Sequence, residues 1–151
     1  MRPLQLAVLL LLVASCEATS PPLNTHAAHD PQAERVKASL ADAFGMRFES
    51  AGPHHELGKT DDGVQLDLVG VPVEQVVLSV PDDDAAAGEA LMPHIRDLLH
   101  GPPRVYEWAE DALACHAAGN GCEQRFEQGN LEARVTSEGG FVVLTVSRGS
   151  G

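Results

Sequence analysis

The chain has 151 residues, of which 22 are acidic and 10 basic, and its formal net charge at pH 7 is −12. This length allows one domain with a modest hydrophobic core. A strongly acidic surface disfavours nucleic-acid binding, because phosphates attract Lys and Arg, and it disfavours lying flat on anionic lipid. The same charge suits a basic protein partner, although solubility alone also accounts for it.

The first 15 residues have the features of a secretory signal peptide. Met1 and Arg2 supply positive charge, and residues 6–14 form an uninterrupted apolar run of nine residues. A helix that crosses a bilayer needs about 20 apolar residues, whereas a signal peptide needs only about 7–15. We therefore expect residues 1–15 to be removed. They contain one basic and no acidic residue, so the remaining 136 residues carry 9 basic and 22 acidic side chains, a net charge of −13.

The apolar run ends in Val13, Ala14, Ser15 and Cys16. This sequence resembles the lipobox of bacterial lipoproteins, in which a cysteine follows a branched apolar residue and two small residues. The resemblance covers residues 1–16. It implies that the thiol of Cys16, a nucleophile, receives a diacylglyceryl group, that the chain is cut before it, and that the new amino terminus is acylated. Ordinary cleavage by a general signal peptidase is the alternative.

Lipidation implies a location in the bacterial cell envelope, anchored through acyl chains such as palmitate and facing the periplasm. Three acyl chains exceed the two signals that stable membrane anchoring requires. In lipoproteins an aspartate directly after the cysteine often signals retention in the inner membrane. Glu17 and Ala18 follow Cys16 here, which favours the outer membrane.

The other two cysteines, Cys115 and Cys122, are separated by six residues. An oxidising periplasm favours a disulfide between them, and the chain-entropy model assigns roughly 2–3 kcal/mol to so short a loop. A metal site with His116 is the first alternative, but zinc needs four ligands at short spacings and no second pair is near in sequence. The second alternative is that both cysteines are free thiols.

Residues 16–30 are small, polar and proline-bearing, and we interpret them as a lipidated N-terminus followed by a flexible tether. About 14 residues extend at most about 50 Å, enough to hold a domain off the membrane. Residues 31–151 are predicted to form a single domain. Its first helix is expected to begin at Asp30 and Pro31, a good N-cap and a good first helical residue, and to end at Gly45.

The middle of the chain is predicted to hold three strands and two helices. The strands are expected at 46–50, 64–68 and 74–80, with the polar segment 51–62 as a loop. Acidic residues 82–84 precede a helix with apolar residues at helical spacing, which Pro93 should kink or split. A third helix follows residues 101–103 and closes at Gly119, with Trp108 on its buried face.

The last thirty residues alternate in three runs at 122–128, 131–137 and 141–148. Gly129 and Asn130 are predicted to form a two-residue turn, so that the numbers of paired residues sum to 259. The fold class is therefore α+β: a helix, three strands, two helices and a three-stranded antiparallel meander.

Sequence motifs for catalysis are not found. There is no Gly-x-Ser-x-Gly, phosphate loop or His-Glu-x-x-His, and the aspartate runs lack the ligand pattern of a calcium loop. We expect no enzymatic activity, no cofactor and no metal.

The sequence favours a membrane-anchored protein-binding or accessory module. The alternative is a lipid-anchored periplasmic inhibitor or immunity protein that neutralises a toxin or hydrolase. A basic protein partner is expected in both cases. The candidate partner-binding residues are Asp82, Asp83 and Asp84.

Overall fold

The computed structural model describes residues 29–149, which form one seven-stranded sheet and three helices. In chain order the elements are α1 (Pro31–Phe44), β1 (Arg47–Gly52), β2 (His55–Lys59), β3 (Gln65–Val69), β4 (Gln75–Pro81), α2 (Ala85–Leu99), α3 (Pro103–Ala117), β5 (Arg125–Gln128), β6 (Leu131–Glu138) and β7 (Phe141–Arg148). The predicted α+β class is confirmed.

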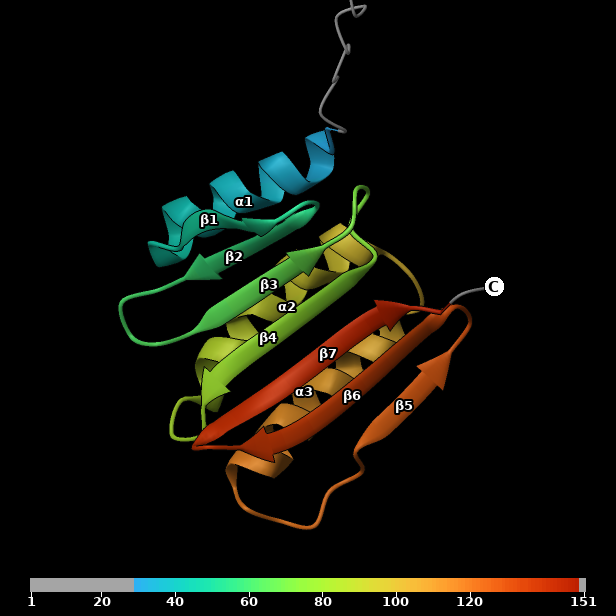
Figure 1. Cartoon of the computed structure of the whole chain (residues 1–151). Coiled ribbons are helices and arrows are strands. Elements are labelled where there is room, and N and C mark those ends of the chain that lie inside the picture. The colour runs from blue at the N-terminus through green and yellow to red at the C-terminus, as the bar shows by residue number, and fades with distance from the viewer. Residues whose placement is uncertain (1–28, 150–151) are drawn as a thin grey trace, which may run out of the picture.

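The strands follow the order β1-β2-β3-β4-β7-β6-β5, and every neighbouring pair is antiparallel. Two meanders, β1–β4 and β5–β7, therefore meet where β4 pairs with β7. Figure 1 shows α2 and α3 crossing behind these two halves, with α1 beside β1 and β2. Because all three helices lie on one side, the other face of the sheet has no helix over it among the described residues.

The hydrophobic core lies between the sheet and α2 and α3. Along β4 and β7 every second side chain is buried, so these strands alternate between a core face and an open face. The helices contribute the rest of the core through apolar residues at helical spacing. The largest fully buried side chains are Leu40, Met46, Leu66, Leu78, Leu91, Met92, Ile95, Leu99, Leu113, Leu144, Val76 and Val80.

The predicted ends of α1 and the C-terminal hairpin register are confirmed. Asp30 is the N-cap of α1, and Gly45 ends the helix in the left-handed conformation, with φ of 64°. In the hairpin, Phe126 pairs with Ala133, as the sum of 259 requires. On the open side of the hairpin, Arg125 forms a diagonal ion pair with Glu132 (3.1 Å).

Three predictions about the middle of the chain are wrong in detail. The segment 51–62 is not a loop, because it contains the end of β1 and all of β2, so four strands precede α2 instead of three. Pro93 does not split α2, which runs unbroken because Leu91, Met92 and Ile95 around it are all buried. Trp108 lies at the margin of the core, stacked on Phe126 at 5.8 Å between ring centroids.

Candidate functional site

The open face of the sheet is the first candidate site. It consists of the side chains that point away from the helices, and its apolar members are half-buried and spread over β2, β3, β4 and β7. They are Leu57, Val69, Val77, Phe141 and Val143. Apolar side chains that share an uncovered sheet face are typical of a surface that meets another macromolecule.

The charged side chains of the open face lie on its two flanks. On the β1–β2 flank, Lys59 bonds Glu49 at 2.8 Å and Arg47 bonds Asp61 at 2.5 Å. On the β5–β6 flank, Arg125 and Arg134 both contact Glu132, at 3.1 and 2.9 Å. These charges are therefore balanced within the face.

Nearly half of the basic side chains lie on this face. Of the nine in residues 16–151, the face carries four: Arg47, Lys59, Arg125 and Arg134. Of the 22 acidic side chains it carries five: Glu49, Asp67, Glu127, Glu132 and Glu138. The remaining five basic and 17 acidic side chains belong to the rest of the chain, so the open face is nearly neutral on a strongly acidic protein.

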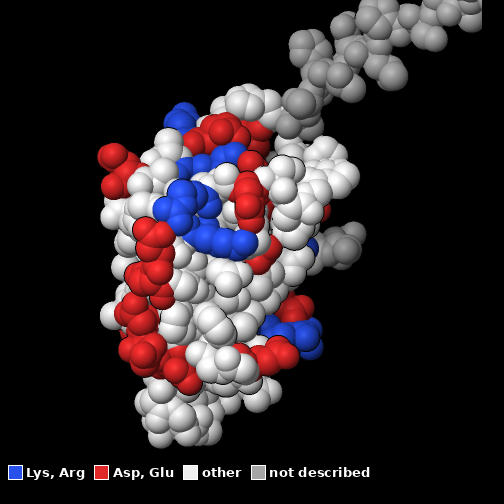
Figure 2. All heavy atoms as spheres, turned by 60° about the vertical axis from the view of Figure 1, so that its left-hand side comes forward, with Lys and Arg blue, Asp and Glu red and all other residues white. Residues whose placement is uncertain are grey.

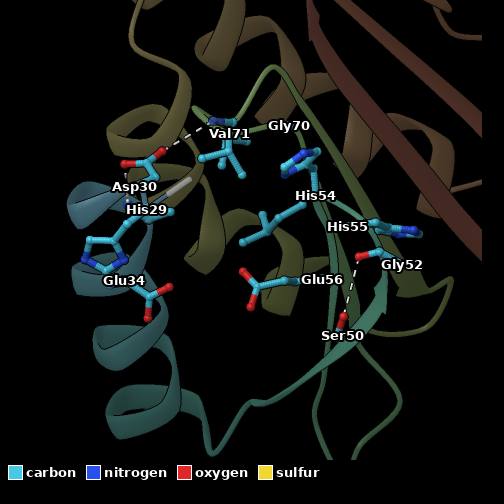
Figure 3. A pocket seen from close by; sticks show the side chains of 13 residues that line it. His29, Asp30, Glu34, Ser50, Gly52, His54, His55, Glu56, Gly70 and Val71 are labelled. Atoms are coloured by element: carbon cyan, nitrogen blue, oxygen red, sulfur yellow. Dashed lines mark hydrogen bonds between the residues drawn. The ribbon is translucent and has the colours of Figure 1, made fainter. Parts of the chain in front are cut away.

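A cavity of about 350 Å³ beside the start of α1 is the second candidate site. Figure 3 shows Glu34 of α1 and Glu56 of β2 facing each other across it. Lys37 bridges these two carboxylates, with its Nζ 2.6 Å from Glu34 and 2.7 Å from Glu56. Burial lowers the pKa of Lys37, but hydrogen bonds to the two glutamates outweigh it and raise the pKa. The bridge therefore favours the charged form of Lys37.

Asp30 occupies the upper end of the same cavity. Its Oδ1 accepts hydrogen bonds from the backbone N–H groups of Gln32 and Ala33, and its Oδ2 accepts one from Val73, at 3.3 Å. Burial raises the pKa of Asp30, but these bonds outweigh it and lower the pKa. Since the carboxylates of the cavity already have partners in the fold, the cavity joins α1 to the sheet.

Three histidines, His29, His54 and His55, line this cavity. His54 is exposed in the turn between β1 and β2, and His55 bonds Asp67 on the open face at 2.7 Å. Over residues 29–149, no group of three or more His, Cys, Asp or Glu side chains is arranged to hold a metal ion.

Asp82, Asp83 and Asp84 lie in the connection between β4 and α2, at one end of the sheet. The backbone N–H of Asp82 bonds Gly140 in the β6–β7 turn at 3.0 Å, which brings Glu138 to the same end. Asp84 is the N-cap of α2, but its side chain makes no capping hydrogen bond. Acidic side chains form a long band on this side of the molecule, with a smaller basic group beside it (Figure 2).

The Sγ atoms of Cys115 and Cys122 lie at disulfide distance, 1.91 Å, with the Cα atoms 6.0 Å apart. The pair connects the end of α3 to the segment before β5. Cys16 lies outside the described residues, as do the predicted signal peptide and most of the predicted tether. Within the described part of the chain, no helix is long and apolar enough to cross a membrane.

Sequence reasoning found the acidic residues but not the open face. Alternation at 64–68 did indicate a two-sided strand, whereas 74–80 was interpreted as a more buried strand. The signal that could have identified the face is Val69, Val77 and Val143, apolar residues at positions that alternation assigns to solvent. No protein-family model, curated protein or solved structure matches this chain.

Proposed function

We propose that this protein is a membrane-anchored module of the bacterial envelope that binds another protein chain through its open face. The observation that supports this proposal is a set of half-buried apolar side chains on a sheet face that no helix covers among residues 29–149. Burying apolar side chains of this kind is the main favourable term in protein association, and the balanced charges around them supply a polar rim.

The anchor in this proposal is lipidated Cys16, on the outer membrane and facing the periplasm. A tether of about 14 residues lets the domain reach partners within about 50 Å, and anchoring raises its local concentration there. We expect Cys16→Ala to stop maturation and remove acyl label from the protein. Wild-type protein that leaves the envelope as a soluble, unacylated chain would contradict the lipobox assignment.

The binding face is tested by Val77→Arg, which places a charge at the centre of the open face. The variant should remain folded, because Val77 is only half-buried and the new guanidinium lies beside Asp67 of β3. Crosslinking in intact envelopes should then capture the partner at least tenfold less, a loss of about 1.4 kcal/mol or more. Ala114→Arg, an exposed position on α3, is the matched control and should capture as wild type does.

If Val77→Arg and Ala114→Arg capture the partner equally, with equal folded fractions by circular dichroism, then the open face is not the binding surface. Hydrolytic or transferase activity in the purified protein, abolished by one histidine or carboxylate substitution, would overturn the binding role.

A second candidate function is inhibition of, or immunity to, a toxin or hydrolase. The acidic end of the sheet, where Asp82, Asp83 and Asp84 meet the β6–β7 turn, favours a basic target. A basic secreted hydrolase that loses activity on adding the purified chain would support this candidate, and full activity at saturating chain would exclude it for that enzyme.

A further inference from the structure

The open face carries one pair of opposite charges, Glu49 and Arg125, at equal distances from its central strand. One cross-strand row runs through all seven strands: Glu49, Leu57, Asp67, Val77, Thr145, Arg134 and Arg125. Val77 of β4 is the middle member, with three strands on each side. The acidic members lie on the β1–β3 side and the basic members on the β5–β6 side.

The adjacent row places a histidine and carboxylates on opposite sides of β4. It contains His55, Val69, Gln75, Ser147, Glu132 and Glu127. His55, a polar side chain that also bonds Asp67, is on β2, and the carboxylates are on β6 and β5. Gln75 of β4 is again central.

We infer that the open face binds a second copy of this chain, as a face-to-face dimer whose twofold axis runs along β4. This inference rests on the proposed function, which makes the open face the binding surface. A twofold axis exchanges the two sides of a surface, so each residue meets the one at the same distance beyond the axis. With the central strands aligned, Glu49 meets Arg125 of the second copy, and His55 meets Glu132 of the second copy.

Val77 contributes an apolar contact at the centre of the same arrangement. It lies on the axis and meets Val77 of the second copy, while Val69 meets Ser147 and Val143 meets Gln65 of the second copy. Sheets that pack face to face lie about 10 Å apart and interdigitate side chains of this size.

The size of the face is close to what a stable dimer needs. Seven strands at about 4.8 Å spacing and about 20 Å length give a flat area of about 600 Å² per copy. Side-chain relief makes the accessible area larger than the flat area, and a standard interface buries about 800 Å² per partner. The near-neutral charge of the open face also matters, because other parts of this acidic chain would repel a second copy.

Crosslinking of the full chain in its own envelope tests the position of the axis. Val77→Cys should place two introduced thiols across the interface, within reach of a bismaleimide about 10 Å long. The expected product has twice the monomer mass, with position 77 joined to position 77 in its peptides. Glu110→Cys, exposed on α3, is the control and should give no such product.

Exchanging the charges of Glu49 and Arg125 tests whether these two residues face each other across the dimer interface. Glu49→Arg should weaken the dimer roughly tenfold, because two attractions per dimer become repulsions, and Arg125→Glu should do the same. The double variant should recover most of the loss, since each new arginine again meets a glutamate. Sedimentation of the purified full chain in detergent measures the dimer dissociation constant, with circular dichroism as the folding control.

The outcomes separate this inference from the proposed function. A chain that stays monomeric, while Val77→Arg still loses capture of a different protein, overturns the dimer and leaves the proposed function standing. A 77-to-77 crosslink without recovery in the double variant overturns the β4 axis. An uncrosslinked Val77→Cys chain, together with unchanged capture by Val77→Arg, overturns both.

Discussion

Asp30 shows how much one side chain contributes to this fold. Its two carboxylate oxygens connect the first turn of α1 to Val73, 43 residues further along the chain. The sequence predicted the N-cap from Asp30 and Pro31, because that role depends on local residues alone. The bond to Val73 depends on where the β3–β4 connection lies, and no local pattern reveals it.

We predict that Asp30→Ala lowers the free energy of unfolding by about 1–2 kcal/mol, through loss of the cap. The lowered pKa of Asp30 makes the effect depend on pH. Its carboxylate stabilises the fold fully above the unfolded-state pKa near 3.8, and that contribution is lost as pH falls through the lower folded-state pKa. Urea unfolding at pH 7 and at pH 3 should show a smaller difference between wild type and variant at pH 3. Equal differences would contradict the assigned role of the charge.

Gly58 is one reason why β2 was not predicted from the sequence. It occupies the core-facing position of β2, where a Cβ atom would lie 2.6 Å from Cε1 of Phe48 and 2.7 Å from the sulfur of Met46. Glu56, on the same side, is held by Lys37 of α1. A strand whose inward positions are glycine and glutamate has no hydrophobic alternation, so its sequence looks like a polar loop.

At the scale of elements, α3 and β5 are connected by the Cys115–Cys122 pair. The pair was predictable because two cysteines remained after Cys16 was assigned to lipidation. The predicted burial of Trp108 was too high. Helical spacing shows which side of α3 carries Trp108, but it does not show that Trp108 lies near the edge of the sheet, where β5 has only four residues.

We predict that the double substitution Cys115→Ser with Cys122→Ser lowers the free energy of unfolding by roughly 2–3 kcal/mol, because the unfolded chain regains the freedom that a disulfide removes. Denaturant unfolding of the purified chain measures the loss, and dithiothreitol-treated wild type is the matched control, expected to unfold like the variant. Mass spectrometry without reduction should show the linked peptide. Two thiols that alkylate freely in the native protein would refute the bridge.

The whole molecule has an uneven charge distribution that composition alone could not predict. The sequence gives a net charge of −13 after residue 15, but only the register of seven strands places four of nine basic residues on one face. The acidic residues that sequence reasoning selected lie at the end of the sheet instead. Pairing between distant strands decides such positions, so a single sequence does not reveal them.

We predict that reversing Asp82, Asp83 and Asp84 to lysine slows association with a basic partner, and that the wild-type rate falls as salt rises. The fold should persist, because Asp84 makes no capping bond from its side chain. Reversal of Glu107, Glu110 and Asp111, exposed on α3, changes the net charge equally and is the matched control. Association rates of wild type and of the two variants, measured at low and high salt, test these expectations. Equal slowing by the two variants would assign the effect to total charge.

The order of the strands also affects the timing of folding. β7 is the last of the seven strands in chain order, yet it lies inside the sheet between β4 and β6. Until β7 pairs with them, β4 and β6 therefore have unpaired edges. Such edges are the usual sites of aggregation and proteolysis. Pairing of β7 thus closes two edges at once and joins the two meanders into one sheet.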